Sequence, residues 1–224
     1  MIRQNLVLAI IVLVLSVFLI EQGKNFSALK DSCEGKSLEN LEIKEVEILG
    51  NSESPLLIEV YSDYQCVFGA RYFKETISPI IEEYVLTGKA HLIYHNLAFE
   101  GQKSQIAAEA AYCANDQGKF WEYHQEVFNE NYQQHKKIDI YSLENLEKIA
   151  KEVDLDICEF SICLNSGKYT ELVKEKTRKG FVEKNINSTP ITFLNHEMIV
   201  DEQGETLGAM PYNILKEQIQ IFIQ

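Results

Sequence analysis

Residues 56–73 read LLIEVYSDYQCVFGARYF, and this stretch decides the fold. The apolar run from Leu56 to Tyr61 predicts a strand, and the residues after Cys66 predict a helix that begins at that cysteine. A cysteine at a helix N-terminus faces free backbone N–H groups and the positive end of the helix dipole, and both favour the thiolate over the thiol. The sequence therefore predicts a reactive thiol at Cys66. A redox pair of the Cys-x-x-Cys type would carry its second thiol three residues later, where this chain has Gly69.

The bulk composition fits one folded domain with a short extension. The chain has 224 residues, a mass of 25.7 kDa and a formal net charge of -13 at pH 7. An acidic surface of this kind argues against nucleic acid or anionic lipid as the main partner. Five cysteines suit an exported protein in an oxidising compartment, and their odd number leaves at least one thiol without an intramolecular partner.

The N-terminus has the pattern of an export signal. Residues 6–20 contain one polar residue, Ser16, and they follow Arg3. No convincing small-x-small cleavage site comes after them. We therefore expect residues 1–22 to remain as a signal anchor in the membrane and residues 23–40 to form a tether, although the apolar run is short for the ~20 residues that a spanning helix needs. Cleavage, which would give a secreted protein, is the alternative, and in both cases the domain lies on the extracytoplasmic side, in a periplasm or at the cell surface.

The predicted elements alternate between strands and helices. The helix that begins at Cys66 is expected to break or kink at Pro79 and to stop near Gly88. The expected strands are 41–49, 56–61, 90–94, 191–194 and 198–200. The expected later helices are 104–116, 119–131, 142–153, 156–165, 168–184 and 211–223. A long helical block thus separates two groups of strands.

Four separated blocks of sequence carry a family resemblance. They read SDYQCVF at 62–68, QGKFWEYH at 117–124, CLNSGKY at 163–169 and STPITF at 188–193. In this order they resemble the DsbA family of thiol-disulfide oxidoreductases, the branch with a Cys-Pro-Phe-Cys motif. The resemblance implies an α/β fold of the thioredoxin type over residues 41–224, with a helical insertion at about 102–187. It also implies a substrate-binding loop at Thr189 and Pro190, whose proline is cis in the family.

The departures from the family pattern concern the active-site motif itself. Within the motif Val67, Phe68, Gly69, the valine replaces the usual proline and the glycine replaces the resolving cysteine. The family also has a buried acid six positions before the first cysteine, where this chain has Val60. The neighbouring Glu59 is one residue off, and a one-residue offset in a strand points a side chain to the opposite face.

These features predict disulfide chemistry that uses a single thiol. We expect an exported oxidoreductase in which Cys66 takes part in disulfide exchange, isomerisation or mixed-disulfide reduction of extracytoplasmic proteins, with an external thiol or a membrane redox partner for release. The alternative is a redox-inactive module that binds extended peptides or acts as a chaperone through the groove beside Thr189 and Pro190. No cofactor is expected, and no metal site, since the histidines show no ligand spacing with the cysteines.

The other four cysteines receive separate interpretations. The resemblance implies a structural disulfide between Cys113 and Cys163, with two buried free thiols as the rival reading. Cys158 is predicted to face water as a spare thiol, because it lies about 160° around the helix from Phe160. Cys33 lies in the tether and is a candidate for a distant resolving thiol.

Overall fold

The structure is a computed structural model that describes residues 33, 48–134 and 139–223. The chain divides into two units, Met1–Glu39 and Asn40–Gln224, and Cys33 is the one described residue of the first. The expected signal anchor and tether, and residues 41–47 of the expected first strand, lie outside the described residues. No helix within the described part of the chain is long and apolar enough to cross a membrane.

The second unit is built on a five-stranded sheet in the order β1-β3-β2-β4-β5. The central strands β2 (Leu56–Ser62) and β3 (Ala90–Asn96) run parallel, and β1 (Ile48–Leu49) pairs antiparallel with β3. On the other side, β4 (Ile191–Leu194) and β5 (Glu197–Met198) continue the sheet with antiparallel pairing. The α/β architecture with a helical insertion agrees with the sequence-based prediction.

The helical segment after Cys66 covers one face of this sheet. It comprises α2 (Val67–Tyr72), η1 (Phe73–Ile77), α3 (Ser78–Ile80) and η2 (Ile81–Val85), of which η1 and η2 are π-helical. The prediction allowed a break or a kink at Pro79, and the structure shows no break there. The backbone stays helical on both sides of it, at Ser78 and at Ile80, and i→i+5 bonding around the proline accommodates its missing N–H.

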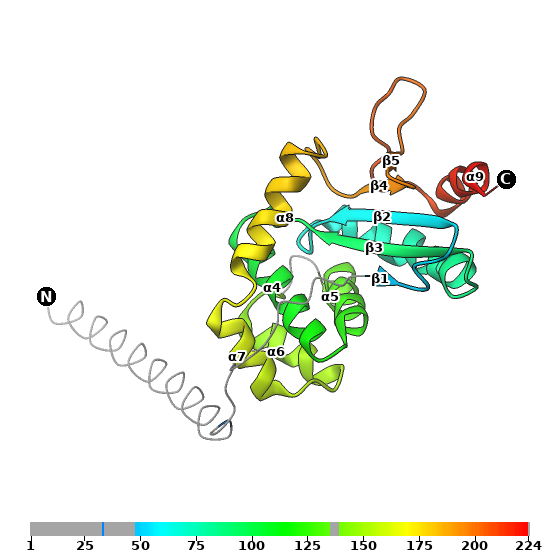
Figure 1. Ribbon diagram of the computed structural model, residues 1–224. Coiled ribbons are helices and arrows are strands. Elements are labelled where there is room, and N and C mark those ends of the chain that lie inside the picture. The colour runs from blue at the N-terminus through cyan, green and yellow to red at the C-terminus, as the bar shows by residue number, and fades with distance from the viewer. Residues whose placement is uncertain (1–32, 34–47, 135–138, 224) are drawn as a thin grey trace, which may run out of the picture. The chain divides into compact units, whose positions relative to one another are not determined.

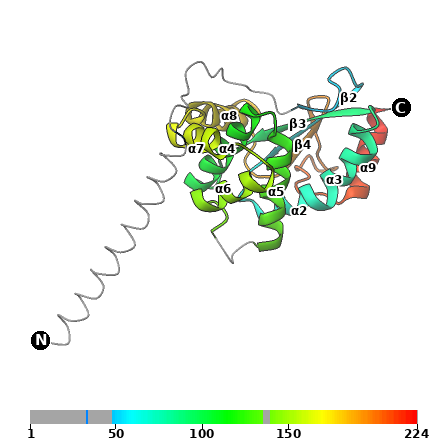
Figure 2. The same cartoon turned by 90° about the horizontal axis from the view of Figure 1, so that it is seen from below.

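The insertion gathers at one end of the sheet. It consists of α4 (Gln102–Asp116), α5 (Phe120–Gln134), α6 (Leu143–Glu152), α7 (Ile157–Ser166) and α8 (Thr170–Val182). Figures 1 and 2 show α4 to α7 beside the end of the strands where β2 leads into α2, and α9 (Tyr212–Phe222) near the opposite end. These helices begin and end within two residues of the predicted positions, except at the end of α5.

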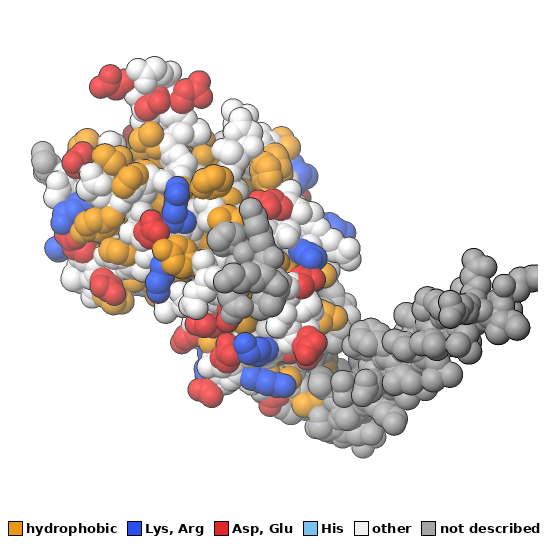
Figure 3. All heavy atoms as spheres, turned by 180° about the vertical axis from the view of Figure 1, so that it is seen from behind, with side chains coloured by type: hydrophobic (Ala, Val, Ile, Leu, Met, Phe, Trp, Pro, Cys, Tyr) orange, Lys and Arg blue, Asp and Glu red, His pale blue; other side chains and the backbone are white. Residues whose placement is uncertain are grey.

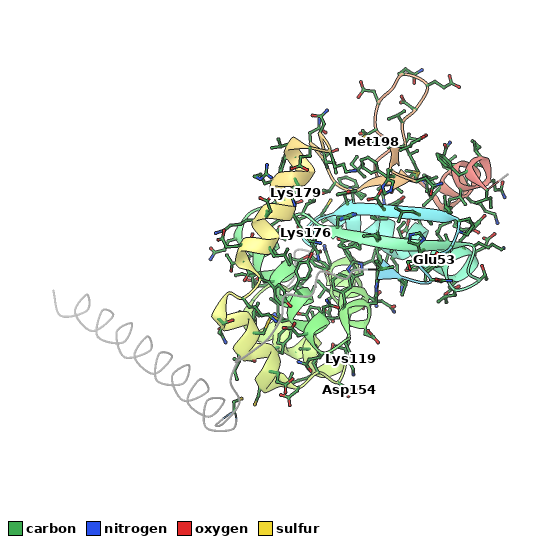
Figure 4. The ribbon with its side chains drawn as sticks, in the orientation of Figure 1. Glu53, Lys119, Asp154, Lys176, Lys179 and Met198 are labelled. Atoms are coloured by element: carbon green, nitrogen blue, oxygen red, sulfur yellow. A yellow bond between two sulfur atoms is a disulfide. The ribbon has the colours of Figure 1, made fainter. Side chains whose placement is uncertain are left out.

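One lysine ties two insertion helices together. The Lys119 ammonium donates to the backbone carbonyls of Val153 and Asp154, at 2.7 and 3.1 Å. Figure 4 shows Lys119 and Asp154 next to one another at the lower edge of the insertion. The last carbonyls of a helix have no partner within the helix. Lys119 therefore acts as a C-terminal cap for α6.

The surface carries charges of both signs between apolar side chains (Figure 3). The loop after β5 projects from the sheet, and its tip carries Asp201, Glu202 and Glu205. The Asp201 carboxylate accepts hydrogen bonds from the backbone N–H groups of Gln203 and Glu205, both at 2.9 Å, so it holds the shape of this tip.

Candidate functional site

Cys66 lies where β2 passes into the helix on the sheet. It is the N-cap of α2, and its Sγ accepts a hydrogen bond from the N–H of Gly69 at 3.4 Å. The side chain is 6 % exposed, and Cys66 is the free cysteine among the described residues. A sulfur in this position interacts with the unpaired N–H groups of the first helical turn, which stabilise negative charge.

The loop before β4 lies against the same sulfur. The Thr189–Pro190 peptide bond is cis, and Cys66 Sγ lies 3.3 Å from the backbone oxygen of Thr189, to which the thiol form can donate. The structure therefore brings the Thr189–Pro190 loop, which the family resemblance implied to bind substrate, next to Cys66 and Gly69.

A buried carboxylate fixes the turn that leads to Cys66. Asp63 is fully buried, and its two oxygens accept from the backbone N–H groups of Gln65, Phe99 and Glu100 at 2.7–2.8 Å. Burial raises the pKa of Asp63, and these bonds, together with the hydroxyl of Ser104, offset part of that rise. Asp63 thus links the turn before Cys66 to the loop after β3, a role that the sequence analysis missed.

A small hollow, too tight to hold a water molecule, lies beneath Gly69. Its lining consists of Val60, Ser62, Gly69, Tyr72, Phe73, Ile77, Tyr94 and Phe128. The Oγ of Ser62 and the hydroxyl of Tyr94 are buried here without a hydrogen-bond partner. Val60 stands in the position that holds an acid in the family pattern, so the hollow contains uncharged hydroxyls and no carboxylate.

The buried ring of His124 lies next to Tyr94, one of the residues that line this hollow. Its Nδ1 lies 2.8 Å from the hydroxyl of Tyr64, its ring centroid lies 4.1 Å from that of Tyr94, and its Nε2 has no partner. Burial holds the pKa of His124 well below its usual value, so the ring is neutral at pH 7.

Glu59 points away from the hollow, as strand alternation predicts. On the far face its carboxylate lies 2.8 Å from Nδ1 of His196, 3.3 Å from Nε2 of His95 and 3.4 Å from the hydroxyl of Tyr61. Burial raises the pKa of Glu59, but the hydrogen bonds and charges of the two histidines outweigh it and hold the pKa below its usual value. Glu59 therefore serves a separate polar cluster and has no contact with the helix start at Cys66.

Two apolar side chains next to Cys66 are exposed. Val67 and Phe68 are 41 % and 60 % exposed, and the guanidinium of Arg71 lies 5.5 Å from the ring centroid of Phe68. A hollow of about 420 Å³ follows along the same helical segment. It is lined by Arg71, Tyr72, Glu75, Thr76, Ala209, Met210, Pro211 and Tyr212.

The remaining cysteines are all in disulfides. Cys113 is bonded to Cys163, the pair that the family resemblance implied. Cys158 is half-buried and disulfide-bonded, so the prediction of a spare thiol facing water is wrong. The helical periodicity predicted which way the side chain points, but it could not show that the sulfur has a disulfide partner. Cys33 is disulfide-bonded as well, and it offers no free thiol that could resolve a bond to Cys66.

Metal-binding chemistry has little support in the described residues. The carboxylates of Glu126, Glu130 and Glu152 lie within 4.8 Å of one another, but they are partly exposed. Exposed acidic groups of this kind are common in proteins without an ion.

Comparisons with known proteins agree with this geometry. A family model described as Thioredoxin matches residues 43–210. The chain is 30 % identical over 140 residues to a protein named probable disulfide bond formation protein D of Bacillus anthracis, and the match covers 58 % of this chain and 59 % of that protein. It is 24 % identical over 181 residues to disulfide bond formation protein D of Bacillus subtilis strain 168, a match that covers 74 % of this chain and 77 % of that protein.

Solved structures show the same fold. The oxidised form of BdbD from Bacillus subtilis matches with a TM-score of 0.69 at 20 % identity, and covers 81 % of this chain and 95 % of its own. The structure of α-DsbA1 from Wolbachia pipientis matches with a TM-score of 0.66 at 20 % identity, over 82 % of this chain and 93 % of its own. At this level of identity the likeness concerns the fold.

Proposed function

Because the chain belongs to the thioredoxin family, we propose that it is a thiol-disulfide oxidoreductase that works through one active-site thiol, Cys66. The observation that carries the proposal is the position of Cys66 Sγ. This sulfur caps a helix, accepts a hydrogen bond from the N–H of Gly69 and lies against the carbonyl oxygen of Thr189. Relatives named disulfide bond formation protein D support the same class of reaction.

The reaction that fits one thiol is exchange. The Cys66 thiolate attacks one sulfur of a disulfide, forms a mixed disulfide with it and releases the other sulfur as a thiolate. A second thiolate, from the substrate or from a small thiol, then attacks the substrate sulfur of the mixed disulfide and restores the Cys66 thiolate. The cycle consumes no oxidant, so it suits isomerisation and removal of mixed disulfides better than net oxidation.

The chain's own residues serve this cycle in distinct ways. The N–H of Gly69 stabilises the Cys66 sulfur when it carries negative charge, both before attack and after release. Asp63 keeps the preceding turn in place through three backbone N–H groups. The exposed Phe68 offers apolar surface for an extended protein substrate, and the hollow beside Tyr212 offers both polar and apolar groups.

The site of action proposed for this reaction is outside the cytoplasm. The basic and apolar N-terminus is the pattern of an export signal, and residues 1–22 would anchor the domain to the membrane unless they are removed. Substrates would then be extracytoplasmic proteins with disulfides, and a small thiol or a membrane redox partner would regenerate Cys66.

Alkylation kinetics test the proposal. The purified domain is treated with iodoacetamide between pH 5 and pH 9, and the rate at Cys66 is read by mass spectrometry. We expect Cys66 to react at pH 6 with a rate that free cysteine reaches only near its ordinary pKa of ~8.5. A second assay follows reduction of a glutathionylated peptide by glutathione, in which Cys66→Ser should abolish the catalysed rate.

A different outcome would favour the second candidate. The exposed Val67 and Phe68 would suit a redox-inactive module that holds extended peptides, and such a module does not need a reactive sulfur. If Cys66 reacts no faster than free cysteine and Cys66→Ser still binds unfolded peptides, the exchange function is overturned and peptide binding remains.

A further inference from the structure

Ser62 occupies space that a side chain at position 69 would need. A Cβ added to Gly69 would lie 2.4 Å from the Oγ of Ser62 and 3.4 Å from the Cβ of Cys66. Two non-bonded heavy atoms do not approach to 2.4 Å in a relaxed structure. The Ser62 hydroxyl therefore lies under the first helical turn, in the place where a Cys-x-x-Cys protein has its second side chain.

This hydroxyl is buried and lacks a partner. Ser62 is 1 % exposed, and its Oγ makes no hydrogen bond with the residues that the structure describes. Buried hydroxyls without a partner are unfavourable, and those that persist in a folded protein call for an explanation. Ser62 lies at the end of β2, opposite Asn96 of β3, and its rotation about a single bond can redirect the oxygen.

The surroundings of Ser62 connect it to the charge on Cys66. Burial raises the pKa of Tyr94 well above its usual value, and the charges of Tyr64, Asp63 and Cys66 raise it further. Tyr94 thus remains a neutral phenol beside Ser62. The other groups that line the hollow are apolar, apart from the hydroxyl of Tyr72, which is paired with the Oγ of Thr192 at 2.7 Å.

We propose that Ser62 donates a hydrogen bond to the sulfur of Cys66 whenever that sulfur carries negative charge, in place of the second thiol that Gly69 lacks. This inference rests on the proposed exchange function and names a further residue for it. The Gly69 N–H approaches the sulfur from the helix, and the Ser62 hydroxyl would approach from the strand beneath. Tyr94 lines the same hollow as Ser62.

The consequence concerns release of the substrate. When an external thiolate attacks the substrate sulfur of the mixed disulfide, the bond between that sulfur and Cys66 Sγ breaks, and its electron pair stays on Cys66. A hydroxyl that stabilises this charge makes Cys66 a better leaving group, since disulfide exchange is faster when the departing thiolate is more stable. Ser62 cannot resolve the mixed disulfide itself, but it makes resolution by an outside thiol easier.

The test compares three variants of the whole exported domain. Ser62→Ala removes the hydroxyl and keeps the Cβ. Gly69→Ala adds a Cβ that displaces the Ser62 oxygen. Ser54→Ala is the matched control, because its Oγ is also buried without a partner but lies in the turn before β2. For each variant, the rate of Cys66 alkylation at pH 6, the equilibrium constant of the Cys66–glutathione mixed disulfide against glutathione, and the melting temperature are measured.

We expect Ser62→Ala and Gly69→Ala to slow alkylation at pH 6 and to favour the mixed disulfide, each by about tenfold, as the loss of one hydrogen bond to a charged atom predicts. Ser54→Ala should leave both quantities unchanged. The inference is overturned if folded Ser62→Ala matches the wild type in both measurements while wild-type Cys66 is reactive. A wild-type Cys66 that reacts no faster than free cysteine would instead overturn the exchange function, and the role of Ser62 with it.

Discussion

The carboxylate of Glu59 lies 2.8 Å from Nδ1 of His196, on the face of the sheet opposite to Cys66. Glu59 is 5 % exposed and belongs to the central strand β2, whereas His196 lies in the turn between β4 and β5 with a φ of 68°. His95 of β3 contacts the other carboxylate oxygen at 3.3 Å. One buried charge therefore connects three parts of the sheet, among them the hairpin that follows the Thr189–Pro190 loop.

Glu59→Gln should destabilise the domain by about 2 kcal/mol at pH 7, because a neutral amide cannot accept from both histidines. The pKa of Glu59 is held below its usual value, so its stabilising effect is present above about pH 4.5 and is lost as the pH falls through the lowered pKa. Urea denaturation at pH 7 and at pH 3 should show the difference between wild type and variant shrinking at the lower pH.

The matched control for this measurement is Glu53→Gln. Glu53 is exposed in the turn before β2, at the end of the sheet shown by its label in Figure 4. Its replacement should change the free energy of unfolding by less than about 0.5 kcal/mol. Equal effects of the two substitutions would contradict a special role for the buried carboxylate.

The disulfide between Cys113 and Cys163 joins α4 to α7 across a sequence separation of 50 residues. On the chain-entropy model, closure of such a loop stabilises the fold by about 4 kcal/mol. The double change Cys113→Ala and Cys163→Ala should therefore lower the free energy of unfolding by roughly that amount, measured in urea. Cys66 alkylation should keep its rate, because the pair lies within the insertion. Non-reducing peptide mapping of the wild type should recover this pair, and a different partner for Cys113 would contradict the assignment.

The local pattern around Cys66 was predictable because it depends on neighbours in sequence. A strand, a turn and a helix start place the sulfur at an N-cap, and strand alternation places Glu59 and Val60 on opposite faces. Cys158 and Ser62 were not predictable in this way. The state of Cys158 depends on a partner that periodicity cannot identify, and the place of Ser62 depends on the absent side chain of Gly69, seven residues away and on another element.

Asp63 illustrates the same limit and gives a further prediction. A single aspartate at a strand end has no periodic signal, and two of its backbone partners, Phe99 and Glu100, lie in a distant loop. Asp63→Asn turns one acceptor into a donor that faces N–H groups, and should cost about 2 kcal/mol of stability. Hydrogen exchange should become faster at the amides of Phe99 and Glu100. Glu100→Gln is the control, since it keeps the backbone N–H and its acceptor, and it should leave both exchange rates unchanged.

The last prediction concerns restoration of the second thiol. Gly69→Cys places a Cβ where the Ser62 oxygen lies, so the new side chain and the serine compete for one space. We expect Gly69→Cys alone to form a disulfide with Cys66 incompletely, and Gly69→Cys with Ser62→Ala to form it more fully in the same glutathione buffer. The fraction oxidised is measured by alkylation of the remaining thiols and mass spectrometry.

In the Gly69→Cys variant, formation of the disulfide with Cys66 and its turnover with a substrate should depend on different residues. Val60 lines the hollow beneath Gly69 and stands where the family has its buried acid, so the restored thiol lacks a proton acceptor in the described surroundings. Adding Val60→Glu should raise turnover of a model disulfide by the restored pair, at a cost of a few kcal/mol in stability, because the new carboxylate is buried. The parent, in contrast, should accumulate mixed disulfides with peptides in the absence of a small thiol. If the parent instead turns over dithiol oxidation as fast as the restored protein, a second sulfur acts with Cys66, and the single-thiol mechanism is wrong.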